Sequence, residues 1–144
     1  MAVKPMLERL LRLRELEEEQ SRLELERAST VHARVEQQRN SVARRQAVMR
    51  RAFVAGIEAG NNLGRSGAVI EMERAREQTA QIELRLAAAE RELRRQREEF
   101  LVRRTSRRQV ETLVDEAKAE LELMASRRAQ QMLDDWYGRR RGKC

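Results

Sequence analysis

The fold is decided by the stretch Gly56-Ile57-Glu58-Ala59-Gly60-Asn61-Asn62-Leu63-Gly64-Arg65-Ser66-Gly67, which holds four of the chain's six glycines. Pro5 is the only proline, and the next glycine is Gly138. The flanking arms are rich in Glu, Arg, Gln, Leu and Ala, which favour or tolerate helix. Because each glycine in a helix interior costs about 1 kcal/mol, one unbroken helix through this stretch is disfavoured. The sequence predicts two long helices that fold back at the glycines.

We therefore expect an all-α protein whose 144 residues form a single antiparallel coiled-coil hairpin, with the C-terminal helix overhanging. The predicted parts are a helix over 6–57, a glycine-rich turn over 58–67, a helix over 68–137 and a basic tail over 138–144. Gly138 is expected to end the second helix. A parallel homodimer of unbroken helices is the alternative, and it would have to carry all four glycines in its middle.

Heptad spacing supports the coiled coil, because apolar residues that alternate in steps of three and four form the seam between paired helices. In the first arm the predicted seam is Ala28, Val31, Val35, Gln38, Val42, Arg45, Met49 and Ala52. In the second arm it is Ile82, Leu86, Ala89, Leu93, Gln96 and Phe100, and it resumes from Val110. Phase changes are expected near Arg27 and over 103–109.

The two arms differ in length, so the second helix should extend past the first. With the turn centred between Asn61 and Asn62 or one residue later, facing positions have numbers that sum to about 125, and Pro5 lies level with Glu120. Residues 121–137 then have no partner helix over about 25 Å. They still carry an apolar stripe made of Leu121, Met124, Met132, Leu133 and Trp136. Uncovered apolar surface of this kind usually marks a docking site for another protein.

Composition argues against an enzyme. Charged residues make up 38% of the chain and aromatic residues 3%, which leaves little apolar surface for a globular core. His32, expected on the flank of the seam or at the surface, is the only histidine, and Cys144 is the only cysteine. Catalytic clusters, an internal disulfide and a thiolate metal site therefore have no support. The glycine stretch lacks the phosphate-binding loop pattern. We expect no cofactor, no membrane span and a cytosolic location.

Arginine clusters give the chain a formal net charge of +7 and raise an alternative function, a basic coiled coil that binds nucleic acid or an acidic membrane surface. Nucleic-acid binding is not expected, because acidic residues intervene and aromatic side chains for base stacking are almost missing. Arg139, Arg140 and Arg141 in the tail are the candidates for electrostatic contact with an acidic protein or a lipid surface.

The segment Arg127-Arg128-Ala129-Gln130-Gln131-Met132-Leu133-Asp134-Asp135-Trp136 resembles the closing motif of the FliJ family of flagellar type III export proteins. That motif has an arginine, a glutamine, two hydrophobic residues, two acidic residues and an aromatic residue, followed by a basic tail. The opening segment from Leu7 to Gln20 is similar to the start of the same family, so the likeness covers essentially the whole chain. Tyr137 departs from the motif, which has a small residue there.

The resemblance implies a cytoplasmic stalk, peripheral to the inner membrane at the flagellar base, whose paired terminal helices enter the central hole of the export ATPase hexamer. It also implies contacts with the membrane export gate and with export chaperones. A stalk of a virulence-type secretion system is the near alternative. The ATPase-facing candidates are Leu7, Leu10, Arg127, Gln130, Leu133, Asp134 and Trp136. Met49, Phe53 and Met72 are candidates for the gate contact, as apolar residues expected to be exposed.

Overall fold

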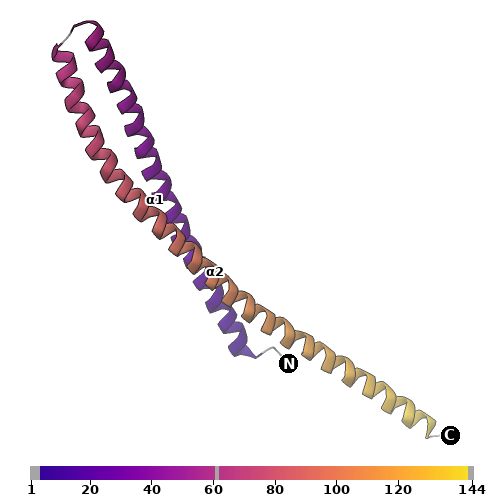
Figure 1. Cartoon of the computed structure of the whole chain (residues 1–144). Helices are drawn as coiled ribbons and strands as arrows, with labels where there is room; N and C mark the ends of the chain where they lie inside the picture. Colours follow the sequence, from indigo (N-terminus) through magenta and orange to yellow (C-terminus); the bar gives the residue numbers. More distant parts are fainter. Residues whose placement is uncertain (1–3, 61, 143–144) are drawn as a thin grey trace. The chain divides into compact units, whose positions relative to one another are not determined.

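The computed structural model describes residues 4–60 and 62–142, which form two long α-helices. Helix α1 spans Pro5–Glu58 and helix α2 spans Asn62–Arg141 (Figure 1). The helices pack against each other, which confirms the predicted all-α hairpin. Neither helix, over these ranges, is long and apolar enough to cross a membrane.

The connection between the helices is much shorter than the predicted turn over 58–67. Helix α1 ends at Glu58, and Gly60 adopts a φ of 69°, a left-handed conformation that glycine adopts without steric cost. The Gly60 amide donates a hydrogen bond to the Ile57 carbonyl over 3.2 Å. Gly64 and Gly67 lie inside the first turns of α2, where their cost to the helix is tolerated. Asn61, at the expected centre of the turn, lies outside the described residues.

The C-terminal segment also differs from the prediction, because Gly138 does not end α2. The helix continues through Arg139, Arg140 and Arg141, which form a basic last turn. Cations at a helix C-terminus interact favourably with the helix dipole, and arginine is a good helix former. The expected basic tail is therefore part of α2 up to Arg141, while Cys144 lies outside the described residues.

The chain divides into two compact units, one of which is Arg22–Glu99. It contains the closed end of the hairpin and a core of Val35, Val42, Ala75, Ile82 and Leu86. The Gln46 amide donates a hydrogen bond to the Thr79 hydroxyl over 3.2 Å, which joins the two helices. This pair matches the expected antiparallel register.

The other unit comprises Met1–Ser21 and Phe100–Cys144. Val110 and Val114 of α2 are its buried core residues. Packed against them are the partly buried side chains of Leu7, Leu10, Leu11, Ala117 and Leu121. This cluster lies where the predicted register brings the start of α1 level with Glu120.

The buried side of α2 follows one uninterrupted heptad pattern, so the predicted phase change over 103–109 is wrong. Steps of three and four connect buried or half-buried residues from Arg65 to Leu121. They are Arg65, Ala68, Met72, Ala75, Thr79, Ile82, Leu86, Ala89, Leu93, Gln96, Phe100, Arg103, Arg107, Val110, Val114, Ala117 and Leu121. The predicted seam from Ile82 to Phe100 is confirmed.

In α1 half of the predicted seam residues are buried or half-buried: Ala28, Val35, Val42 and Met49. The buried or half-buried heptad positions are Leu7, Leu11, Arg14, Glu18, Ser21, Leu25, Ala28, His32, Val35, Val42, Gln46, Met49, Phe53 and Gly56. The expected seam residues Val31, Gln38, Arg45 and Ala52 are exposed, since the residue after each is the heptad position. No phase change occurs near Arg27, and His32, expected on the flank of the seam or at the surface, is partly buried.

Polar side chains occupy several of these positions and pair across the helices. In the unit of the chain termini, Arg103 Nη1 lies 3.3 Å from Glu17 Oε2, and Arg107 Nε bonds to Glu18. The hydrogen bond to Glu18 raises the pKa of Arg107 above its usual value. In the other unit, His32 Nε2 lies 3.7 Å from a Glu36 oxygen and 3.8 Å from a Glu90 oxygen. Ion pairs between arginine and glutamate thus continue the seam at Arg103 and Arg107, where apolar residues are missing.

Candidate functional site

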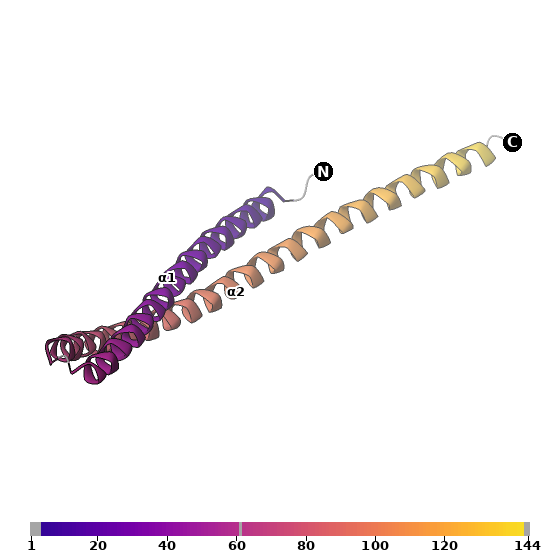
Figure 2. The ribbon, with the colours of Figure 1, turned by 90° about the horizontal axis from the view of Figure 1, so that it is seen from above.

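The main candidate site is the stretch of α2 that has no partner helix. Leu121 is half-buried, but every residue from 122 to 142 is exposed. Figures 1 and 2 show the yellow end of α2 running on alone past the N-terminal end of α1. We call residues 122–142 the overhang. Its position agrees with the expectation drawn from the unequal arm lengths.

The overhang carries a stripe of large apolar side chains, formed by Met132, Leu133, Trp136 and Tyr137. Spacings of three and four residues place these side chains on adjoining parts of one helix face. Leu133 is 51% exposed and Trp136 is 52% exposed, which is unusual for side chains of this size. The N-terminal end of the overhang adds a groove lined by Leu121, Glu122, Met124, Ala125 and Arg128. Such a face is suited to packing against another protein.

Aromatic and cationic contacts organise the end of the stripe. The rings of Trp136 and Tyr137 meet edge to face with centroids 5.1 Å apart, and the Arg140 guanidinium carbon lies 4.9 Å from the Trp136 ring centroid. Tyr137 and Arg140 were missed as members of this site. The four-residue spacing from Trp136 to Arg140 was the signal that could have identified the second of them.

The predicted polar candidates Arg127, Gln130 and Asp134 are also exposed on the overhang. Gln130 Nε2 donates a hydrogen bond to Asp134 Oδ1 over 3.4 Å. At about 100° per residue, however, Arg127 and Asp134 point away from Trp136. Arg127 and Asp134 therefore lie on the side of the helix away from Trp136, whereas Gln130, three residues before Leu133 and seven before Tyr137, lies at the edge of the apolar stripe.

Leu7 and Leu10, predicted beside the overhang, lie in the paired part of the unit. Both are half-buried against the cluster of Val110 and Val114. They stabilise the helix pair immediately before the overhang begins, and most of their surface is not free for a partner.

Met49, Phe53 and Met72 are not the exposed residues that we expected. All three are half-buried at heptad positions near the closed end of the hairpin, because apolar side chains at these positions pack between the helices. Phe53 has an open side, since it lines a groove of about 520 Å³ with Arg65, Ser66, Val69 and Ile70.

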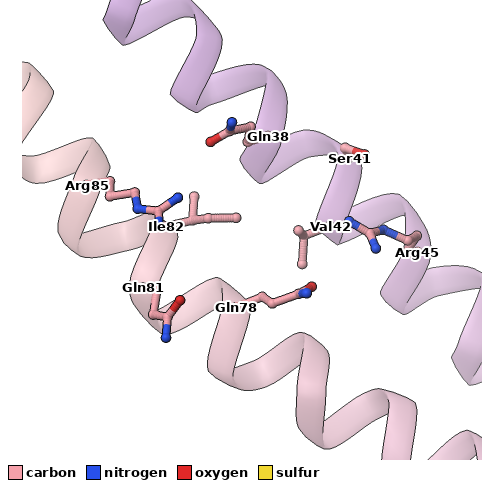
Figure 3. A pocket seen from close by; sticks show the side chains of 8 residues that line it. All are labelled: Gln38, Ser41, Val42, Arg45, Gln78, Gln81, Ile82 and Arg85. Carbon is pink, nitrogen blue, oxygen red and sulfur yellow. The ribbon is translucent and has the colours of Figure 1, made fainter.

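No arrangement suited to catalysis is found in the described ranges. A groove of about 340 Å³ lies between the helices. In it Val42 and Ile82 are directed toward each other, and Arg45 and Arg85 lie at its sides (Figure 3). Its lining contains Gln and Ser side chains but no histidine, cysteine or carboxylate. No cluster of metal-ligating side chains occurs in residues 4–60 and 62–142.

The fold defines an all-α protein of the helical-hairpin class. Over residues 3–142 the chain matches the model of the family described as Flagellar FliJ protein, and it belongs to that family. The family is a non-catalytic component of flagellar protein export and associates with the export apparatus. Comparisons with curated proteins and with solved structures found no match.

Proposed function

We propose that this chain is the stalk of the flagellar export ATPase, with the overhang docked in the central hole of the ATPase hexamer. The observation that carries the proposal is the exposed stripe from Met132 to Tyr137. A lone helix with large apolar side chains gains stability by burying them in a partner. Family membership supports a role in export, and the resemblance of the closing motif supports this partner.

A ring-shaped partner also accounts for the two different sides of the overhang. A helix inside a hole is contacted around its whole circumference, so apolar and polar sides both meet partner residues. Leu133 and Trp136 would be the buried anchors, since large aromatic and aliphatic residues dominate interface energies. Arg127 and Asp134 would hydrogen-bond on the side away from Trp136, and Gln130 would do so at the edge of the apolar stripe. Leu7 and Leu10 would hold the helix pair at the mouth of the hole.

Contacts with the export gate and with export chaperones belong to the same proposal. For the gate we retain Met49, Phe53 and Met72, which would act through the open groove beside Phe53 rather than as free side chains. The chain would then work in the cytoplasm at the inner membrane of the flagellar base. No residue of the described part is assigned to the chaperones.

The test is a double substitution, Leu133→Ala with Trp136→Ala, measured for binding to the cognate export ATPase. Binding should weaken by at least about 2 kcal/mol, roughly thirtyfold, if these residues are interface anchors. The control is Leu84→Ala with Val102→Ala, which removes two exposed apolar side chains outside the overhang. Equal binding by both variants would place the docking surface elsewhere, and lost helicity in the first would make the stripe an internal core.

A further inference from the structure

The closed end of the hairpin has an excess of positive charge. Residues 37–70 contain six arginines and one acidic residue, Glu58, so this segment has a net charge of +5 out of +7 for the chain. The arginines are Arg39, Arg44, Arg45, Arg50, Arg51 and Arg65, and the first five are exposed. In residues 5–36 and 71–99 glutamates are interleaved with the arginines, whereas residues 103–108 and 139–141 are further arginine runs without an acidic residue. The closed end therefore differs in its electrostatic field from the paired residues 71–99 that follow it.

The same end exposes large aliphatic side chains. We call Val54, Ile57, Leu63 and Ile70 the apolar tip. Leu63, in the first turn of α2, is 87% exposed, the highest value among the large hydrophobic residues of the described ranges. Val54 and Ile57 are three residues apart and share a face of α1, and Leu63 and Ile70 are seven apart and share a face of α2.

Basic and apolar groups occur on the same face at this end. Arg50 precedes Val54 by four residues and Ile57 by seven, so its side chain lies on the same side of α1. An interfacial membrane contact needs this combination, because aliphatic side chains enter the boundary of the acyl chains while arginines remain among anionic headgroups. Helical backbone suits this location, since its hydrogen bonds are satisfied internally.

We propose that the closed end of the hairpin, residues 37–60 and 62–70, binds the surface of an anionic lipid bilayer. A nucleic acid would complement the arginines electrostatically but would leave the aliphatic side chains exposed. Base stacking, in addition, needs aromatic residues. Phe53 is the only aromatic residue of the segment and is half-buried. This lipid contact is independent of ATPase docking, which the proposal above assigns to the overhang.

The experiment is cosedimentation of the full chain with phosphatidylglycerol-containing vesicles and with pure phosphatidylcholine vesicles. The protein should bind the anionic vesicles, and binding should weaken as salt rises. At about fivefold per arginine, Arg50→Gln with Arg51→Gln should weaken binding about 25-fold. Ile57→Gln with Leu63→Gln should weaken it roughly tenfold or more, because two aliphatic side chains no longer enter the bilayer.

The matched control is Val31→Gln with Leu84→Gln, which changes two exposed apolar residues of the same unit outside the tip and should leave binding within about twofold. Circular dichroism verifies that every variant is helical. Absence of binding to anionic vesicles at low salt overturns the proposal. So does unchanged binding by Ile57→Gln with Leu63→Gln, and so does tighter binding of a short DNA duplex that depends on Arg50 and Arg51 but not on Ile57 and Leu63.

Discussion

The paired and unpaired stretches of α2 contain similar apolar residues, but these residues are buried in the paired stretch and exposed in the unpaired one. Leu86 in the paired stretch is 4% exposed, whereas Leu133 in the overhang is 51% exposed. Both are leucines of one helix, so neither residue type nor local conformation separates them. The difference is the reach of α1, which begins at Pro5 and leaves the overhang without an intramolecular neighbour. The length of the partner helix thus decides whether a large apolar residue of α2 is buried or exposed.

The largest effect on stability should come from the same substitution made in the two stretches. Leu86→Ala should lower the free energy of unfolding by about 2–3 kcal/mol, because it removes buried methyl groups and leaves a cavity. Leu133→Ala should change it by less than about 0.5 kcal/mol. Urea unfolding followed by circular dichroism measures both. Similar losses in the two variants would mean that the overhang is packed in the free protein.

Polar side-chain pairs in the two stretches should also differ in coupling free energy, but by a smaller amount. Glu18 and Arg107 join the two helices with side chains that are 19% and 22% exposed, whereas Gln130 and Asp134 pair within the exposed overhang. A double-mutant cycle with Glu18→Gln and Arg107→Gln should give a coupling free energy of about 1 kcal/mol. The corresponding cycle with Gln130→Ala and Asp134→Ala should give about 0.3 kcal/mol or less. Equal coupling energies would remove the distinction.

The smallest effect concerns Glu92, an acidic residue of the paired stretch. Hydrogen bonds from Arg95 and then Gln96 lower the pKa of Glu92 from 4.5 to about 2. Since the folded-state pKa lies below the unfolded value, this carboxylate stabilises the fold above about pH 4.5, and the contribution disappears as the pH falls through about 2. An NMR titration should find a midpoint near 2, and Arg95→Gln should move it upward. A midpoint of 4.5 in the native chain would contradict the hydrogen-bond geometry.

The hairpin and its register could be predicted because both follow from backbone chemistry. The glycine stretch located the reversal, and its position set which residues of the two helices face each other. The length of the turn could not be derived, since only Gly60 needs a left-handed conformation. Gly64 and Gly67 are tolerated in helix once flanking turns form.

The phase of the α1 seam was mispredicted because its true positions include polar residues. Val31 and Ala52 were assigned to the seam because they are apolar, but His32 and Gln46 occupy the partly buried side of α1. Gln46 is satisfied by Thr79, a contact that cannot be deduced from α1 alone. The expected break over 103–109 had the same cause, since Arg103 and Arg107 continue the seam through glutamates of the partner helix.

For the candidate site, the overhang followed from helix lengths, and its exposed residues agree with that derivation. The burial of the candidates for the gate contact could not be predicted from the sequence. Met49, Phe53 and Met72 are apolar residues in a charged sequence, and only the tertiary pairing reveals that they face the other helix.

The central claim is that the overhang is an unpaired helix in the free protein, and hydrogen exchange on the full chain tests it most directly. Lone helices are marginally stable in water, so amides of residues 124–138 should exchange about a hundredfold or more faster than those of residues 82–93. Adding the export ATPase should slow exchange in 124–138. Equal protection of the two segments in the free chain would contradict the account, because it would show that the overhang is already packed against something.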